Sequence, residues 1–225
     1  MVRHHTIDNL RGFAFILMFI FHLYSIWDAI NGTNYRQASI LHYMGIIART
    51  LFILLAGYSI YMSYKKHKDD FKTERTKRSI TILVHAIIMT LASYILTPDK
   101  YIRFGILHFI FLTTLISPLF APYKTLTLII FILSIIIDYP QVNEIIDTIT
   151  GARVHNSMMD WFPLNKNLPI ILLGLVIAQQ INRPLKINIL EREIPIVTEL
   201  GKNSLNLYTG HYVIIMIVYK IISLL

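Results

Sequence analysis

The residues best suited to chemistry lie near the start of the chain, where Arg11 and His22 stand eleven positions apart. Eleven residues make about three turns of an α-helix, so both side chains project from one face, about 16 Å apart along the axis. Arginine binds phosphate groups through a planar fork of N–H donors. Imidazole, with an ordinary pKa of about 6.5, accepts a proton from an incoming amine or hydroxyl. The spacing therefore favours a reaction path that joins an anionic donor site to an acceptor site.

The element that must position this pair is predicted to be a membrane-spanning helix. Residues 10–27 are almost wholly apolar, and about 18 such residues at about 1.5 Å each approach the hydrocarbon thickness of a bilayer. An ionisable side chain at that depth costs a few kcal/mol unless it is paired or faces a cavity. We therefore expect the face with Arg11 and His22 to look into protein or water. A cleaved signal peptide is the alternative for residues 1–28, although the apolar run is long for one and no small-residue cleavage site follows it.

Other ionisable and polar residues lie in or beside the apolar segments and form two groups, one on the Arg11 side of the membrane and one on the His22 side. Intramembrane histidines can also be hydrogen-bonded struts between helices, and Asp160 can belong to an interfacial aromatic anchor with Trp161. As candidate catalytic residues we predict His22, His108, Asp160 and His211, and as candidate donor-binding residues Arg11, Arg49, Arg78, Lys202 and Asn203.

The composition is that of a membrane protein. Of the 225 residues, 55% are hydrophobic and 15% are charged, whereas about a quarter of the residues in soluble domains are charged. The chain contains no cysteine, which excludes disulfides and thiolate zinc sites. We expect no metal site and no nucleic acid partner.

The apolar segments predict an all-α fold, a polytopic transmembrane bundle of about seven helices, with six to eight as the range. We expect a single domain over residues 1–225, and a homo-oligomer is compatible with this pattern. Prolines fall near the segment ends, where the missing N–H does little harm. The seven segments are 8–28, 41–64, 80–97, 104–121, 125–138, 168–181 and 204–225.

The basic residues predict the orientation. Most lysine and arginine side chains fall on the side that holds the N terminus, which places that terminus in the cytoplasm and the C terminus outside. The densest basic run extends from Lys65 to Arg78. It is interpreted as an anchor to anionic membrane lipids, with binding of a phosphorylated cytosolic ligand as the alternative.

A resemblance to a known family rests on five blocks that occur in one order along the chain. The arginine and histidine of the first helix look like a signature of integral-membrane acyltransferases. The whole set resembles, more closely, small proteins related to the catalytic domain of heparan-alpha-glucosaminide N-acetyltransferase. The blocks are Ile7–Gly12 with His22, Leu51–Ser59, Arg103–Ile110, Met159–Leu164 leading to Gly174, and Leu200–Leu205 with Tyr208 and His211.

The resemblance implies a transmembrane helical bundle that transfers acetyl from cytosolic acetyl-CoA to an amino sugar across the membrane. It implies that Arg11 and His22 line the reaction path, with His108, Asp160 and His211 beside them. We therefore expect acetyl-CoA or a related acyl-CoA as donor, and an amine or hydroxyl of an extracytoplasmic sugar or glycan as acceptor. Both direct transfer, with His22 as general base, and an acetyl-histidine intermediate fit this interpretation.

Two other classes of protein explain part of the pattern. A small-solute or proton-coupled transporter would also place arginine and histidine within the membrane, although the sequence contains no convincing internal repeat. A structural membrane subunit explains the hydrophobic segments but not the shared face of Arg11 and His22. Dependence on acyl-CoA separates the enzyme from both.

Overall fold

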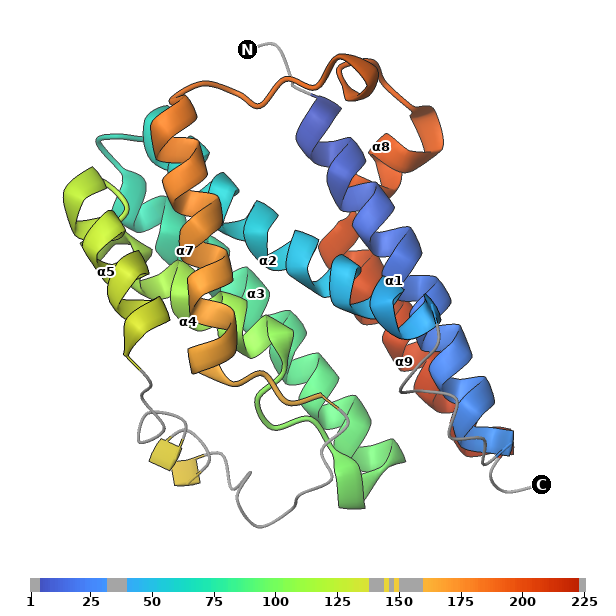
Figure 1. Cartoon of the computed structure of the whole chain (residues 1–225). Coiled ribbons are helices and arrows are strands. Elements are labelled where there is room, and N and C mark those ends of the chain that lie inside the picture. The colour runs from blue at the N-terminus through green and yellow to red at the C-terminus, as the bar shows by residue number, and fades with distance from the viewer. Residues whose placement is uncertain (1–4, 32–39, 138–143, 146–147, 150–159, 223–225) are drawn as a thin grey trace. The chain divides into compact units, whose positions relative to one another are not determined.

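The chain folds into helices, as the apolar segments predict. The computed structural model describes residues 5–31, 40–137, 144–145, 148–149 and 160–222, and all structural statements concern these residues (Figure 1). Their eight α-helices are α1 (His5–Asn31), α2 (Ile40–Lys66), α3 (Phe71–Leu96), α4 (Ile106–Ile116), α5 (Lys124–Ile136), α7 (Leu164–Ile181), α8 (Pro195–Lys202) and α9 (Ser204–Ile222). The all-α fold class is confirmed.

Five helices are long and apolar enough to cross a membrane, namely α1, α2, α3, α7 and α9. The helices α4 and α5 are apolar but shorter, and they match the two predicted segments at 104–121 and 125–138. All seven predicted segments therefore correspond to helices. This pattern is that of a multi-pass membrane protein.

The structure differs from the predicted segments in two places. Helix α3 begins at Phe71 rather than at residue 80, because its charged first turns favour helix without raising hydropathy. Helix α8 was not among the predicted segments, since eight residues are too few to form a spanning run. It begins with Pro195 at its first position, where proline is favoured.

The chain divides into two compact units, each of which is described by itself. One unit contains residues 1–52 and 185–225, and the other contains residues 53–184. Helix α2 contributes its first half to one unit and its second half to the other. The expected single domain over residues 1–225 stays a prediction.

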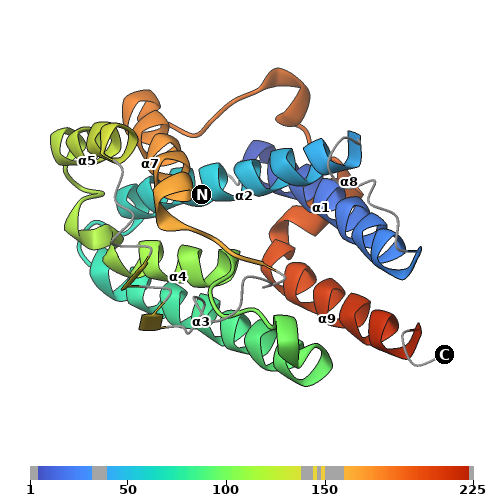
Figure 2. The same cartoon turned by 60° about the horizontal axis from the view of Figure 1, so that its bottom comes forward.

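In the unit with both termini, α1 packs against α8 and α9 (Figure 2). Two glycines allow the α1 and α8 backbones to touch, because a Cβ at Gly12 would overlap the carbonyl oxygen of Val197, and one at Gly201 would overlap that of Asp8. The side chain of Asn9 is fully buried. Its amide donates to the carbonyls of Leu190 and Arg192, which ties the connection before α8 to α1.

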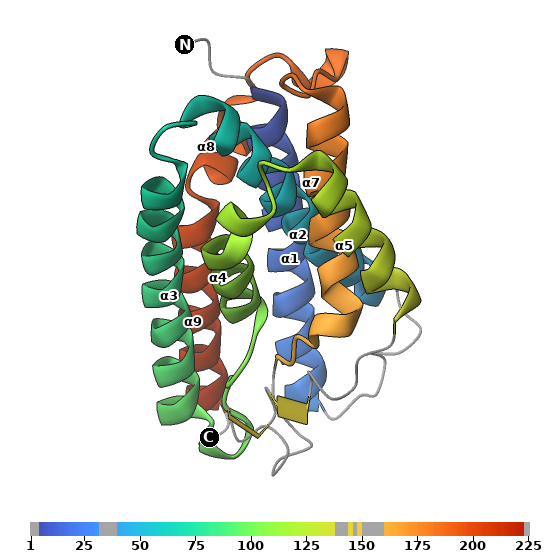
Figure 3. The ribbon, with the colours of Figure 1, turned by 90° about the vertical axis from the view of Figure 1, so that its left-hand side faces the viewer.

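In the unit of residues 53–184, α3 lies beside α4, and α5 lies beside α7 (Figure 3). The second half of α2 crosses α7 with backbone contact at Gly57 and Gly174, where a Cβ would overlap the carbonyl oxygen of Ile171 or of Leu54. Such small-residue crossings are typical of membrane helices.

Candidate functional site

Two of the predicted catalytic histidines meet within one unit. His22 on α1 and His211 on α9 are 189 positions apart in sequence, yet the Nδ1 atom of His22 lies 2.8 Å from the Nε2 atom of His211. The His211 side chain is buried, and that of His22 is half-buried. The packing of α9 along α1 thus forms a hydrogen-bonded histidine pair.

The second nitrogen of His211 determines how protons are arranged in this pair. His211 Nδ1 lies 2.7 Å from the carbonyl oxygen of Leu207, one helical turn earlier. A carbonyl oxygen only accepts hydrogen bonds, so Nδ1 must carry a proton and donate it. In neutral His211 the lone pair is then on Nε2, and His22 must donate to it from Nδ1. This tautomer of His22 leaves a basic lone pair on Nε2.

Aromatic rings surround the histidine pair. The ring of Tyr212 lies edge-on to His22 with centroids 5.0 Å apart, and the ring of Phe15 lies edge-on to His211 at 5.3 Å. Tyr208 is within 6.3 Å of the His22 ring and 5.6 Å of the His211 ring. Packed rings fix the imidazole planes and lower the local polarity, which strengthens hydrogen bonds within the pair.

The predicted donor-binding residues Arg11, Lys202 and Asn203 belong to the same unit. The guanidinium of Arg11 forms an ion pair with Asp8, with 3.5 Å between Nη1 and Oδ1. Lys202 Nζ donates to Glu199 Oε2 at 3.2 Å and to Glu193 Oε1 at 3.3 Å. These bonds raise the pKa of Lys202, so its ammonium stays charged at neutral pH.

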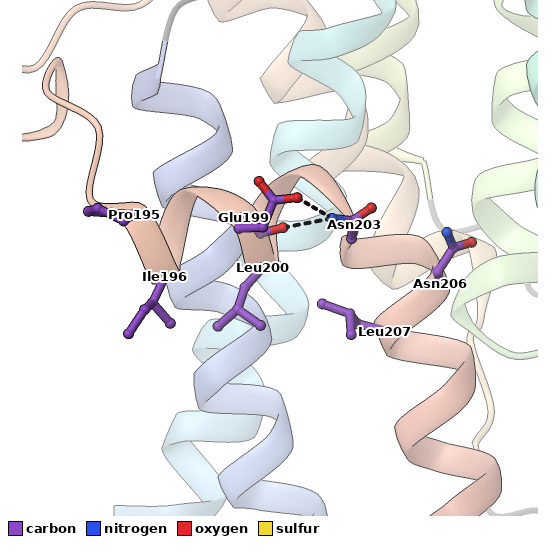
Figure 4. Close-up of a pocket in the computed structure, with 7 residues that line it drawn as sticks. All are labelled: Pro195, Ile196, Glu199, Leu200, Asn203, Asn206 and Leu207. Atoms are coloured by element: carbon purple, nitrogen blue, oxygen red, sulfur yellow. Dashed lines mark hydrogen bonds between the residues drawn. The ribbon is translucent and has the colours of Figure 1, made fainter.

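An open pocket of about 740 Å³ lies at the bend between α8 and α9 (Figure 4). Along its polar edge, the side-chain amide of Asn203 donates to Glu199, with 2.7 Å between Nδ2 and Oε1. Apolar and polar side chains both line the pocket: Pro195, Ile196, Leu200 and Leu207 on one hand, and Glu199, Asn203 and Asn206 on the other. Leu207 lines the pocket with its side chain, and its carbonyl oxygen accepts the hydrogen bond from His211.

His108 and Asp160 belong to the other unit, where both bond to the beginning of α4. The Nδ1 atom of His108 accepts the backbone N–H of Gly105 at 3.2 Å, and its Nε2 lies 3.2 Å from the hydroxyl oxygen of Thr90. Asp160 Oδ2 accepts the backbone N–H of Ile106 at 3.1 Å. These bonds satisfy N–H groups that the helix itself leaves without an acceptor. The geometry thus gives both residues a capping role, and their part in catalysis stays a prediction.

The two remaining predicted donor residues lie on other helices. Arg49 is half-buried on the first half of α2, in the unit of the histidine pair, and Arg78 is exposed on α3 in the other unit.

Among the described residues, no group of three or more histidine, aspartate or glutamate side chains could hold a metal ion.

Tyr208 and Tyr212, which lie beside the histidine pair, were not among the predicted site residues, and neither was the Leu207 carbonyl that orients His211. The tyrosines had a detectable signal, since positions 208, 211 and 212 fall on one helix face. The Leu207 carbonyl had none beyond the helical repeat, because every helical carbonyl has the same spacing.

Comparison with protein-family models gives one match. The model described as heparan-alpha-glucosaminide N-acetyltransferase, catalytic, matches residues 3–213. Comparison with curated proteins and with solved structures gave no match. The matched range includes both histidines of the pair and confirms the resemblance inferred from the five sequence blocks.

Proposed function

Because this chain belongs to the heparan-alpha-glucosaminide N-acetyltransferase catalytic domain family, we propose that it transfers an acetyl group from acetyl-CoA to an amine or hydroxyl of an extracytoplasmic sugar or glycan. The family is one of membrane acetyltransferases, in agreement with the five long apolar helices. The observation that most supports the proposal is the 2.8 Å contact between His22 and His211, since acyl transfer needs a positioned base.

In direct transfer, His22 acts as the general base. Its Nε2 takes a proton from the acceptor while the acceptor nitrogen or oxygen attacks the thioester carbonyl. The new C–N or C–O bond forms as the C–S bond breaks, and the proton passes from His22 to the departing CoA thiolate. Each turnover then leaves His22 neutral again, with acetylated acceptor and free CoA as products.

His211 orients this base. Its Nε2 accepts the Nδ1–H of His22, and its own Nδ1 is held by the Leu207 carbonyl. As His22 becomes positive, the hydrogen bond to His211 becomes charge-assisted and stronger. His211 therefore stabilises the protonated base without being the proton acceptor itself.

An acetyl-histidine intermediate is the alternative mechanism. Here His22 Nε2 attacks the thioester carbonyl, CoA leaves as thiolate, and the acceptor then removes the acetyl group from nitrogen. That sequence predicts ping-pong kinetics, whereas direct transfer needs a ternary complex. Initial-rate kinetics with both substrates varied distinguish the two.

The donor is proposed to enter from the cytosol. Arg11, Lys202 and Asn203 are the candidates for its phosphates on the side of the N terminus, and the roles of Arg49 and Arg78 stay predictions from the sequence. The acceptor is proposed to approach from the other side, with the N terminus cytoplasmic and the C terminus outside. Labelling of single cysteines introduced at each terminus, in sealed cells, tests this orientation because the chain has no native cysteine.

The deciding experiment combines binding with turnover. The purified protein in detergent should melt at a higher temperature with acetyl-CoA, since a ligand at about 100 times its Kd adds about 2.7 kcal/mol. In liposomes, radiolabelled acetyl groups should move from external or internal acetyl-CoA to glucosamine. No thermal shift and no transfer, in a protein that is well folded, would reject the enzyme.

A proton-coupled transporter is the second candidate, because a hydrogen-bonded histidine pair is also suited to proton movement. The same liposomes decide between them. Solute uptake or proton flux without release of CoA favours the transporter, and release of one CoA per acetylated acceptor favours the enzyme.

A further inference from the structure

The pocket at the bend between α8 and α9 has the chemistry of a subsite for part of the donor. We propose that it holds the pantetheine arm of an acyl-CoA, the neutral chain between the phosphates and the thioester. This proposal rests on the proposed function and adds the location of one section of its donor. Figure 4 shows Leu200 and Leu207 extending from the two helices toward the space at their bend.

The lining matches a neutral chain that carries amide groups. Ile196, Leu200 and Leu207 provide apolar walls for methylene and methyl groups, while the carboxamides of Asn203 and Asn206 can bond amides. Neither lysine nor arginine is among the lining residues, so phosphates would not be retained within the pocket itself. A lipid tail, in contrast, would leave the two carboxamides without use.

One residue, Leu207, connects the pocket with the histidine pair. Leu207 lines the pocket, and its carbonyl accepts the Nδ1–H of His211. His211 therefore lies one helical turn beyond the pocket wall, and Asn203 and His211 are about 12 Å apart along the helix. An extended arm can span this distance, which would place the thioester sulfur toward the histidines.

One edge of the pocket is charged. Glu199, a lining residue, accepts hydrogen bonds from both Lys202 and Asn203. Lys202, which also pairs with Glu193, thus partly neutralises the one carboxylate among the lining residues and places an ammonium just outside the pocket. Lys202 lies between the lining residues Leu200 and Asn203 in sequence, and His211 follows the lining residue Leu207 by one helical turn. The two ends of a bound arm would therefore each have a group of fitting chemistry nearby, an ammonium for the phosphates and an imidazole for the thioester.

The test uses the full chain in detergent, with displacement of radiolabelled acetyl-CoA by two fragments. S-acetylpantetheine contains the arm without the nucleotide, and adenosine 3′,5′-bisphosphate contains nucleotide phosphates without the arm. Leu200→Trp fills the pocket, Asn206→Leu removes an exposed carboxamide at little risk to folding, and Ile214→Trp is the control on an exposed position of α9.

We expect Leu200→Trp to weaken S-acetylpantetheine binding at least tenfold and Asn206→Leu to weaken it about fivefold. Both variants should bind adenosine 3′,5′-bisphosphate within about twofold of the wild-type chain, and Ile214→Trp should bind all probes normally. If Asn206→Leu and folded Leu200→Trp both bind S-acetylpantetheine as the wild-type chain does, the subsite is wrong. It is also wrong if the pocket is found to hold phospholipid.

Failure of the proposed function gives a different result. If the wild-type chain binds acetyl-CoA and the two pocket variants behave as expected, but no acceptor becomes acetylated, the pocket stands and the transferase is rejected. If the wild-type chain binds neither acetyl-CoA nor S-acetylpantetheine, both proposals are wrong. If transfer occurs and the pocket variants bind normally, only the subsite is wrong.

Discussion

The Nδ1 atom of His22 and the Nε2 atom of His211 are 2.8 Å apart, and the other nitrogen of His211 is held by the carbonyl oxygen of Leu207. This chain of two hydrogen bonds has one direction in the neutral state, because its last member can only accept. Of the two histidines, His22 therefore has the basic lone pair, on its Nε2 atom. The roles of the two histidines differ, and mutation can separate them.

Replacing His211 by phenylalanine should remove the orienting bond while filling the same aromatic site. We expect the transfer rate to fall by about 10- to 100-fold, since the His22 imidazole is still present as a base but its tautomer is no longer fixed. Donor binding and the melting temperature should change little, because the ring of Phe15 can pack against the new ring. Measurement of kcat and KM for both substrates checks this. A variant with wild-type kcat would show that His211 does not position the base.

Replacing His22 by alanine should affect chemistry more severely. Loss of a general base lowers rates by about 10²–10⁴-fold, and loss of a nucleophile would abolish transfer, so the residual rate should be at or near background. Acetyl-CoA should still raise the melting temperature. His42→Ala on α2 is the matched control, because it removes an imidazole outside the pair and should leave kcat unchanged. Equal activity of the two variants would refute the assignment of the base.

Replacing Arg11 by alanine should weaken donor binding rather than the chemical step. The guanidinium is half-buried and pairs with Asp8 at 3.5 Å, a distance at which it can exchange toward a phosphate. A charged hydrogen bond contributes about 1.5–3 kcal/mol, so the Kd of acetyl-CoA should rise about 10- to 100-fold. Arg11→Lys keeps the charge without the planar fork. Its Kd for acetyl-CoA should lie between that of the wild-type chain and that of Arg11→Ala. A normal Kd in Arg11→Ala would place the phosphates elsewhere.

The sequence predicted the helices well because membrane spanning depends on composition summed over about 20 residues. It could not predict the start of α3 or the presence of α8, since both depend on local helix preference and tertiary packing. In α8, Gly201 touches the α1 backbone, and Thr198 bonds the buried side chain of Asn9. No hydropathy window detects such contacts.

The candidate site was predicted as a set of residues but not as an arrangement. His22 was favoured in sequence because it shares a helix face with Arg11, and His211, His108 and Asp160 were candidates because each is an ionisable group near membrane depth. The structure brings His22 and His211 together and gives His108 and Asp160 hydrogen bonds at the beginning of α4. Pairing across 189 positions depends on how α9 packs on α1, which spacing along the chain does not encode.

The α4 contacts predict that His108 and Asp160 matter for stability. His108→Ala leaves the N–H of Gly105 without its acceptor, and Asp160→Ala does the same to Ile106. Each loss should lower the free energy of unfolding by about 1–3 kcal/mol, measured by denaturation in mixed micelles. Asp160→Asn retains an accepting oxygen and should be nearly as stable as the wild-type chain. If Asp160→Asn is stable but has no transfer activity, the carboxylate has a catalytic part as well.

The crossing of α2 and α7 gives the last prediction. A Cβ at Gly174 would overlap the carbonyl oxygen of Leu54 and lie 3.1 Å from the backbone nitrogen of Tyr58. Because backbone atoms cannot rotate away, Gly174→Ala must push the helices apart, at a cost of about 1–3 kcal/mol. Gly210→Ala on α9 is the control, since a Cβ there meets nothing within 4 Å. That variant should gain up to about 1 kcal/mol from better helix propensity. Opposite shifts of melting temperature in the two variants would establish that backbone contact holds α2 against α7, and a neutral Gly174→Ala would exclude it.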